Sequence, residues 1–221
     1  MTAKNEPNLA KDLRLVHLVI TRGLDVSIDN AVKYARGGFP NPELHEGYRK
    51  YVTALLSFVS AHHLAEDEIA FPYFETRMPE TPFNQLKDEH ERIEQLLEQG
   101  QEHLTQLDDE PEAALRDLDA VLSEMRDLWH PHIDTEEAHF DVERLADILP
   151  PEEHERLSGK MAQHTIEHAE PTPLVVPFGL YNLPDDQRKI LVANMPPDVI
   201  NELVPGPWRD EWAPMEPFLL V

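Results

Sequence analysis

Hydrophobic residues in the first two thirds of the chain recur three and four positions apart, the spacing of one face of an α-helix. Four stripes of this kind can be followed: Leu9, Leu13, Val16, Ile20 and Leu24; Tyr51, Leu55, Phe58 and Val59; Ile93, Leu96, Leu97 and Leu104; and Leu115, Leu118, Leu122, Met125 and Trp129. Segments rich in proline, glycine or acidic residues separate the stripes. The pattern therefore predicts four long helices, near 9–37, 42–76, 82–107 and 111–148, and a fifth over 152–169.

The short connections between these helices make sequential neighbours antiparallel, which predicts an all-α, up-down-up-down four-helix bundle. Half of the 20 prolines fall in residues 171–221, so the composition changes near residue 170. We expect a bundle with its added helix over 1–170 and a Pro-rich, partly helical C-terminal extension over 171–221 that packs on the bundle.

Within the extension, residues 183–195 and 196–204 are predicted to form two short helices. The remainder carries a cluster of large apolar residues: Trp208, Trp212, Met215 and Phe218. We interpret this cluster as a hydrophobic clasp against the bundle. The alternatives are a lid over the entrance of a functional site and a partner-binding surface.

Charge and composition narrow the class of function. The chain has 43 Asp and Glu against 19 Lys and Arg, a formal net charge of -24. Such a surface repels phosphate, which argues against nucleic acid and anionic membranes as partners. The absence of cysteine excludes disulfides, Fe–S clusters, thiolate zinc sites and cysteine nucleophiles. Because there is no signal-peptide core or long apolar run, we expect a cytoplasmic protein.

Histidine is abundant, with 12 residues, and two of the predicted helices carry a similar motif. The second helix places His62 and Glu66 four residues apart, and the fourth places His132 and Glu136 at the same spacing. Residues four apart lie on one face of a helix. The spacing alone is weak evidence in so acidic a chain, because it also occurs in two other pairs: His90 with Glu94, and His139 with Glu143.

The level of the histidines along the bundle gives a second test. A helix rises about 1.5 Å per residue, so His17 and His62 each lie roughly 30 Å from the turn that joins their helices. By the same measure, His90 and His132 lie about 26 and 32 Å from the turn between the third and fourth helices. Across the turn between the second and third helices, Glu66 lies about 15 Å before the turn and His90 about 12 Å after it, so all four helices bring a histidine to nearly one level of the bundle.

Several imidazoles and two carboxylates inside a bundle would cost several kcal/mol each to bury unpaired, and metal ions remove that cost. Donors of this kind suit iron, with manganese or zinc less favoured. Two carboxylates from opposite helices can bridge two metal ions. A ferritin-like site would need Glu-x-x-His on two helices, but this pattern occurs only at Glu136 and His139.

The segments HHLAEDEIAFP and HIDTEEAHF, a histidine near the start of the first helix and an EH pair on the third together resemble the hemerythrin-like (HHE cation-binding) family. The resemblance covers roughly residues 9–148. It implies a four-helix bundle around a non-haem di-iron centre. Carried onto this chain, it implies one iron on His17 and His62, the other on His90 and His132, and bridges from Glu66 and Glu136.

The chain departs from the oxygen-carrying members of that family on the third helix, where they have a His-x-x-x-His pair. Here Leu86 stands four residues before His90, and Glu94 stands four after it. His63 or Glu94 could replace the missing ligand. His63 could equally be a hydrogen-bonded core histidine.

These observations lead us to expect a protein that binds dioxygen or a related small oxidant, such as peroxide or nitric oxide, for sensing, storage or detoxification. The alternatives are a di-iron oxidase or oxygenase acting on an organic substrate and a regulatory module that responds to iron or oxygen. The sequence identifies neither a catalytic residue nor a protein partner.

Overall fold

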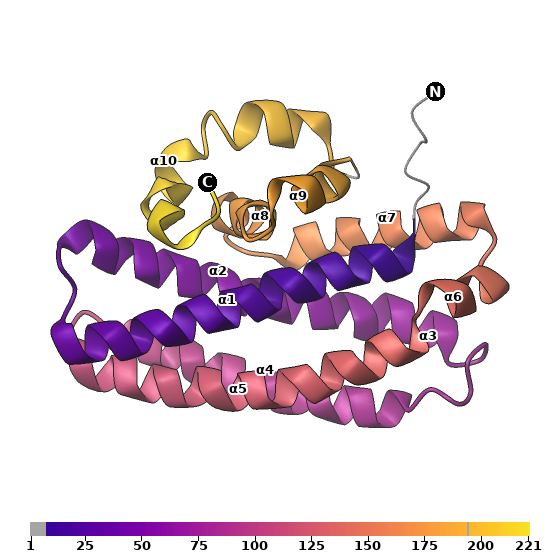
Figure 1. Cartoon of the computed structure of the whole chain (residues 1–221), viewed down its shortest axis with the longest axis horizontal. Helices are drawn as coiled ribbons and strands as arrows, with labels where there is room; N and C mark the ends of the chain where they lie inside the picture. Colours follow the sequence, from indigo (N-terminus) through magenta and orange to yellow (C-terminus); the bar gives the residue numbers. More distant parts are fainter. Residues whose placement is uncertain (1–7, 194) are drawn as a thin grey trace.

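The computed structural model describes residues 8–193 and 195–221, and every regular element in these ranges is a helix (Figure 1). The predicted all-α class is therefore confirmed. Residues 1–7 and Asn194, which the predictions for the bundle and for the 183–195 helix include, lie outside the described residues. The four long helices are α1 (Leu9–Gly37), α2 (Pro42–Ala65), α4 (Phe83–Thr105) and α5 (Pro111–His139).

Local signals in the sequence set the first helix boundaries. The Asn8 side chain accepts a hydrogen bond from the backbone N–H of Lys11 and caps the start of α1. Gly38 ends α1 with a φ of 69°, in the left-handed region where glycine has no steric penalty. Asn41 then caps α2 by accepting from the N–H of Leu44, with Pro42 as the first helical residue.

The long helices share one apolar core. Helix α1 packs against α2 and α5, and α4 packs against the same two helices. Each contributes fully buried leucine or isoleucine side chains, among them Leu24, Leu55, Ile93 and Leu122. Burial of such side chains contributes roughly 1.5–3 kcal/mol each relative to exposure. No helix of the described residues is long and apolar enough to cross a membrane.

The second predicted helix is interrupted by a wider turn. Helix α2 ends at Ala65, and a π-helical turn, η1 (Glu66–Ala70), follows before α3 (Phe71–Phe74). Turns of this kind often mark functional sites. The backbone N–H of Glu66 is directed to the carbonyls of both His62 and His63.

The prediction of a single helix over 111–148 is wrong. Helix α5 stays helical through Pro131 and ends at His139, and α6 (Val142–Ile148) begins after a break. The Asp141 side chain accepts hydrogen bonds from the N–H groups of Glu143 and Arg144, which caps a new helix. Phe140, at the break, is buried in a second apolar cluster.

The rest of the chain forms short helices after α7 (Pro151–His168). These are α8 (Thr172–Tyr181), α9 (Asp185–Val192), the π turn η2 (Val199–Leu203), α10 (Arg209–Trp212) and the 3-10 helix η3 (Ala213–Phe218). Helices α8 and η3 pack against α2. Figure 1 shows this C-terminal part on the side of α1 and α2, away from α4 and α5.

The last short helices make close contact with the first half of α2. Trp212, Met215 and Phe218 are buried, and the Tyr48 and Phe218 rings meet edge to face. At Gly47 a Cβ atom would lie 2.0 Å from the carbonyl oxygen of Pro214, so only glycine permits this approach.

A group of polar contacts also joins the C-terminal part to the bundle. The hydroxyl of Tyr51 donates to Oδ1 of Asn182 at 2.7 Å. Arg22 donates from Nη1 to the carbonyl of Phe218 at 3.0 Å and also to Asn182. Because Tyr51 and Asn182 are buried, these bonds satisfy groups that would be costly without partners.

Candidate metal centre

The side chains selected from the sequence as metal ligands come together in the interior of the bundle. All are at most 4% exposed: His17, His62, Glu66, His90, His132 and Glu136. His17 comes from α1, His62 from α2 and His90 from α4, whereas α5 supplies the last two residues. The histidines of four helices therefore do meet at one level.

The first group of potential ligands consists of His17, His62, Glu66 and Glu136. One donor atom from each lies within 4.8 Å of the others. Nε2 of His17 is 3.2 Å from Oε2 of Glu136, and Nε2 of His62 is 3.4 Å from Oε2 of Glu66. These donor atoms are close enough to surround a single cation.

The second group consists of His63, Glu66, His90 and His132, again within 4.8 Å of one another. Nε2 of His90 lies 3.2 Å from Nε2 of His132 and 3.6 Å from Oε2 of Glu66. Glu66 thus belongs to both groups. Glu136 also approaches the second, because its Oε1 is 3.6 Å from Nε2 of His132.

The two less certain ligands are placed differently. His63 is 3% exposed and stacks on His90 with ring centroids 4.0 Å apart, inside the second group. Glu94 does not join the cluster, since its exposed side chain accepts a hydrogen bond from the hydroxyl of Ser60. It stands one turn beyond His90, about 6 Å farther along α4.

Many of the atoms in the cluster that could bind a metal have no hydrogen-bond partner among the described residues. They are Nε2 of His17 and His62, both ring nitrogens of His63, Oε2 of Glu66 and both carboxylate oxygens of Glu136. A buried polar atom without a partner costs roughly 1–3 kcal/mol. Cations bound between these atoms would remove that cost, so the residues fit metal ions.

Three further carboxylates, which were not predicted from the sequence, orient the histidines of the cluster from outside it. Each lies 2.9–3.0 Å from Nδ1 of a cluster histidine: Glu137 from His17, Asp67 from His90, and Glu89 from His132. An ionised carboxylate only accepts, so Nδ1–H donates and leaves Nε2 free to bind a metal. The only feature of the sequence that could have identified these carboxylates is their position, because each is directly adjacent to a residue of the cluster.

The cluster's electrostatics depend on burial and on its internal charges. Burial, reinforced by the charges of Glu136 and Asp67, raises the pKa of Glu66 well above its ordinary value. Burial also opposes ionisation of Glu136, but the imidazoles of His132 and His17 outweigh it and hold the pKa of this carboxyl at about 2. Burial lowers the pKa of His63 well below its ordinary value, which keeps this imidazole neutral and able to bind a metal.

An aromatic wall closes one side of the cluster. The Trp129 ring is buried and lies edge-on to His17, with ring centroids 5.3 Å apart. Its Nε1–H donates to the Thr21 hydroxyl at 2.9 Å, which fixes the ring's orientation. This wall restricts the space beside the first group.

An all-helical protein with two overlapping groups of buried imidazoles and carboxylates, each supported by outer carboxylates, belongs to the class of cation-binding helical proteins. A family model described as the hemerythrin HHE cation binding domain matches residues 8–141, more than half of the chain. The chain belongs to this hemerythrin family, whose domains bind metal cations, and the predicted resemblance is confirmed. No curated protein and no solved structure is significantly similar to the chain.

Proposed function

We propose that the chain is a non-haem di-iron protein that binds dioxygen or a related small oxidant. The observation that carries this proposal is the overlap of the two donor groups at Glu66. Two groups that share a carboxylate suit two metal ions bridged by it. We also propose the up-down-up-down arrangement of α1, α2, α4 and α5, which the short connections between these helices support.

The donor positions support a specific assignment of ligands. In this proposal His17 and His62 hold one iron, and His90 and His132 hold the other. His63 supplies a fifth imidazole, from α2 rather than from α4, next to His90. Glu66 bridges the two ions, and Glu136 bridges them from α5, since its oxygens face His17 and His132.

The donor set favours iron. It combines imidazole nitrogens with carboxylate oxygens and contains no thiolate, because the chain has no cysteine. A pair of ferrous ions in such a site supplies the electrons for reduction of a small oxidant. The protein's own part is to present five imidazoles to the metal ions, to fix the orientation of three of them through outer carboxylates, and to exclude bulk water.

An anaerobic iron titration tests the proposal. Metal-free protein is loaded with ferrous iron, freed of excess metal and analysed, and we expect two irons per chain. The loaded protein is then exposed to dioxygen, and the absorbance of the iron centre should change. Retention of one iron or none, or an absorbance that dioxygen and peroxide both leave unchanged, would refute it.

A further inference from the structure

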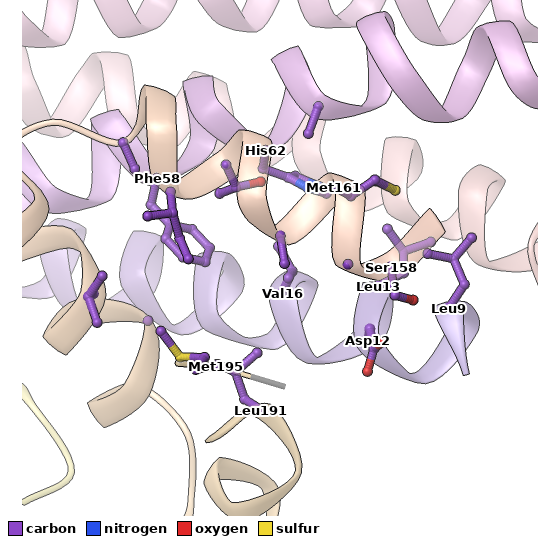
Figure 2. Close-up of a pocket in the computed structure, with 18 of the residues that line it drawn as sticks. Leu9, Asp12, Leu13, Val16, Phe58, His62, Ser158, Met161, Leu191 and Met195 are labelled. Carbon is purple, nitrogen blue, oxygen red and sulfur yellow. The ribbon is translucent and has the colours of Figure 1, made fainter. Parts of the chain in front are cut away.

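A cavity lies directly beside the candidate metal centre, on the side where α7 and α8 cover α1 and α2. Its volume is about 430 Å³. This falls within the range of roughly 300–1,000 Å³ that is typical of small-molecule sites. Figure 2 shows Val16 of α1, His62 of α2 and Met161 of α7 around its middle.

The cavity adjoins the metal centre through one shared residue. His62 lines the cavity, and Nε2 of the same ring lies 3.4 Å from Oε2 of Glu66. A molecule in the cavity would therefore touch a ligand of the proposed centre. The Phe58 side chain lies at one end, near Met195 and Leu191, which belong to the C-terminal part (Figure 2).

The chemistry of the walls changes along the cavity. Most lining side chains are aliphatic, aromatic or thioether groups, and no Lys or Arg lines it among the described residues. At the end opposite Phe58, Figure 2 shows Asp12 and Ser158 beside Leu9 and Leu13; His62 and Thr165 are further polar residues of the lining. Glu155 also lines the cavity and adds a second carboxylate.

These walls discriminate between possible ligands. An apolar wall gains from contact with an alkyl chain, at roughly 25 cal/mol per Å² of buried apolar surface. The acidic end repels a carboxylate head group and accepts hydrogen bonds from a hydroxyl or ammonium group. Burial raises the pKa of Asp12, opposed by its hydrogen bond with Ser158, so this carboxyl lies in a partly desolvated setting.

We propose that the cavity binds a linear aliphatic molecule that ends in a hydrogen-bond donor, such as a primary alcohol or amine. Its chain lies along Val16, Met161 and His62, and its donor group faces Asp12 and Ser158. This proposal goes beyond the proposed function and does not depend on it, because the cavity walls exist whichever metal the cluster holds.

Calorimetric titration of the full chain tests the proposal, with 1-decanol, decylamine and decanoate as probes. The titrations are made on anaerobic iron-loaded protein and on metal-free protein. We expect the alcohol and the amine to bind to both forms, and decanoate to bind at least tenfold more weakly. Binding of the amine without the alcohol would reflect the overall negative charge of the chain and would overturn the proposal. So would equal binding of decanoate.

Two glycines provide a matched pair of variants. Gly159 lines the cavity and Gly37 lies at the end of α1, away from it; at both, a Cβ atom would meet nothing within 4 Å. Gly159→Phe should weaken 1-decanol binding at least tenfold, and Gly37→Phe should leave it unchanged. Equal affinities of the two variants would place the ligand elsewhere and refute the site.

Replacement of the acidic end tests the selectivity. Asp12→Asn should bring decanoate to within a few-fold of 1-decanol, and an unchanged preference would contradict the assigned orientation. Metal analysis of the same samples separates the two proposals. An iron content other than two per chain would refute only the proposed di-iron centre. Absence of alcohol binding in protein that carries two irons would refute only the proposed cavity ligand.

Discussion

Removal of the outer carboxylate at Glu137 should weaken one of the two metal positions selectively. Oε1 of Glu137 accepts from Nδ1 of His17 at 3.0 Å, and its other oxygen lies 3.3 Å from Nε of Arg14. His17 belongs to the first donor group only. Glu137→Ala should therefore weaken binding of the ion in that group and spare the ion held by His63, His90 and His132.

The size of the effect follows from the exposure of the carboxylate. Loss of an outer-shell partner typically costs 10–100-fold in metal affinity. The Glu137 side chain is 32% exposed, so solvent and Arg14 already screen part of its charge. We expect about tenfold, or about 1.4 kcal/mol, for Glu137→Ala. Glu137→Gln keeps an acceptor for Nδ1–H and should lose only a few-fold.

Chelator competition with ferrous iron under anaerobic conditions measures both affinities. Glu143→Ala is the matched control, because Glu143 is an exposed carboxylate on α6 and its removal changes the net charge equally. If Glu143→Ala and Glu137→Ala lower iron affinity equally, overall charge explains the effect and the orienting role is wrong. Loss of the second ion before the first would contradict the assignment of the groups.

Three further predictions address the centre and the clasp. Glu66→Ala should abolish simultaneous binding of two irons, because Glu66 serves both groups, and metal analysis should find at most one iron per chain, with Glu143→Ala still retaining two. His63→Leu should lower the affinity for one iron in the same chelator titration and leave the affinity for the other within twofold. Binding of two irons with unchanged affinities would show that His63 is a core residue and not a ligand. Gly47→Ala should lower the thermal midpoint by roughly 2–12 °C, from about 1–3 kcal/mol of overpacking against Pro214, and an unchanged midpoint by calorimetry would show that the contact does not stabilise the protein.

The sequence predicted the long helices well because periodicity and breakers agree there. It missed the break at Phe140, because apolar residues such as Leu145 and Ile148 continue the helical pattern beyond it. Only the capping side chain of Asp141 signals the break, and an aspartate is a weak signal in so acidic a chain.

The candidate site was predicted in part. The His-x-x-x-Glu spacing, the level of four histidines and the family resemblance together selected six side chains, and these do converge. His63 stayed ambiguous because its direction depends on the helix around the π turn at Glu66, which periodicity does not reveal. Among 43 acidic residues, adjacency to a ligand did not distinguish Asp67 or Glu137. The cavity depends on how α7 and α8 are placed, which a single sequence does not specify.

The contact between Gly47 and Pro214 joins α2 to a segment that is synthesised much later, and this imposes an order on folding during synthesis. Chains fold from the N-terminal end as they are synthesised. The apolar face of α2 that receives Met215 and Phe218 therefore stays uncovered until η3 has been synthesised. His62 stands near the other end of α2 and Glu66 directly follows that helix, so the metal cluster can assemble in the nascent bundle before that face is closed.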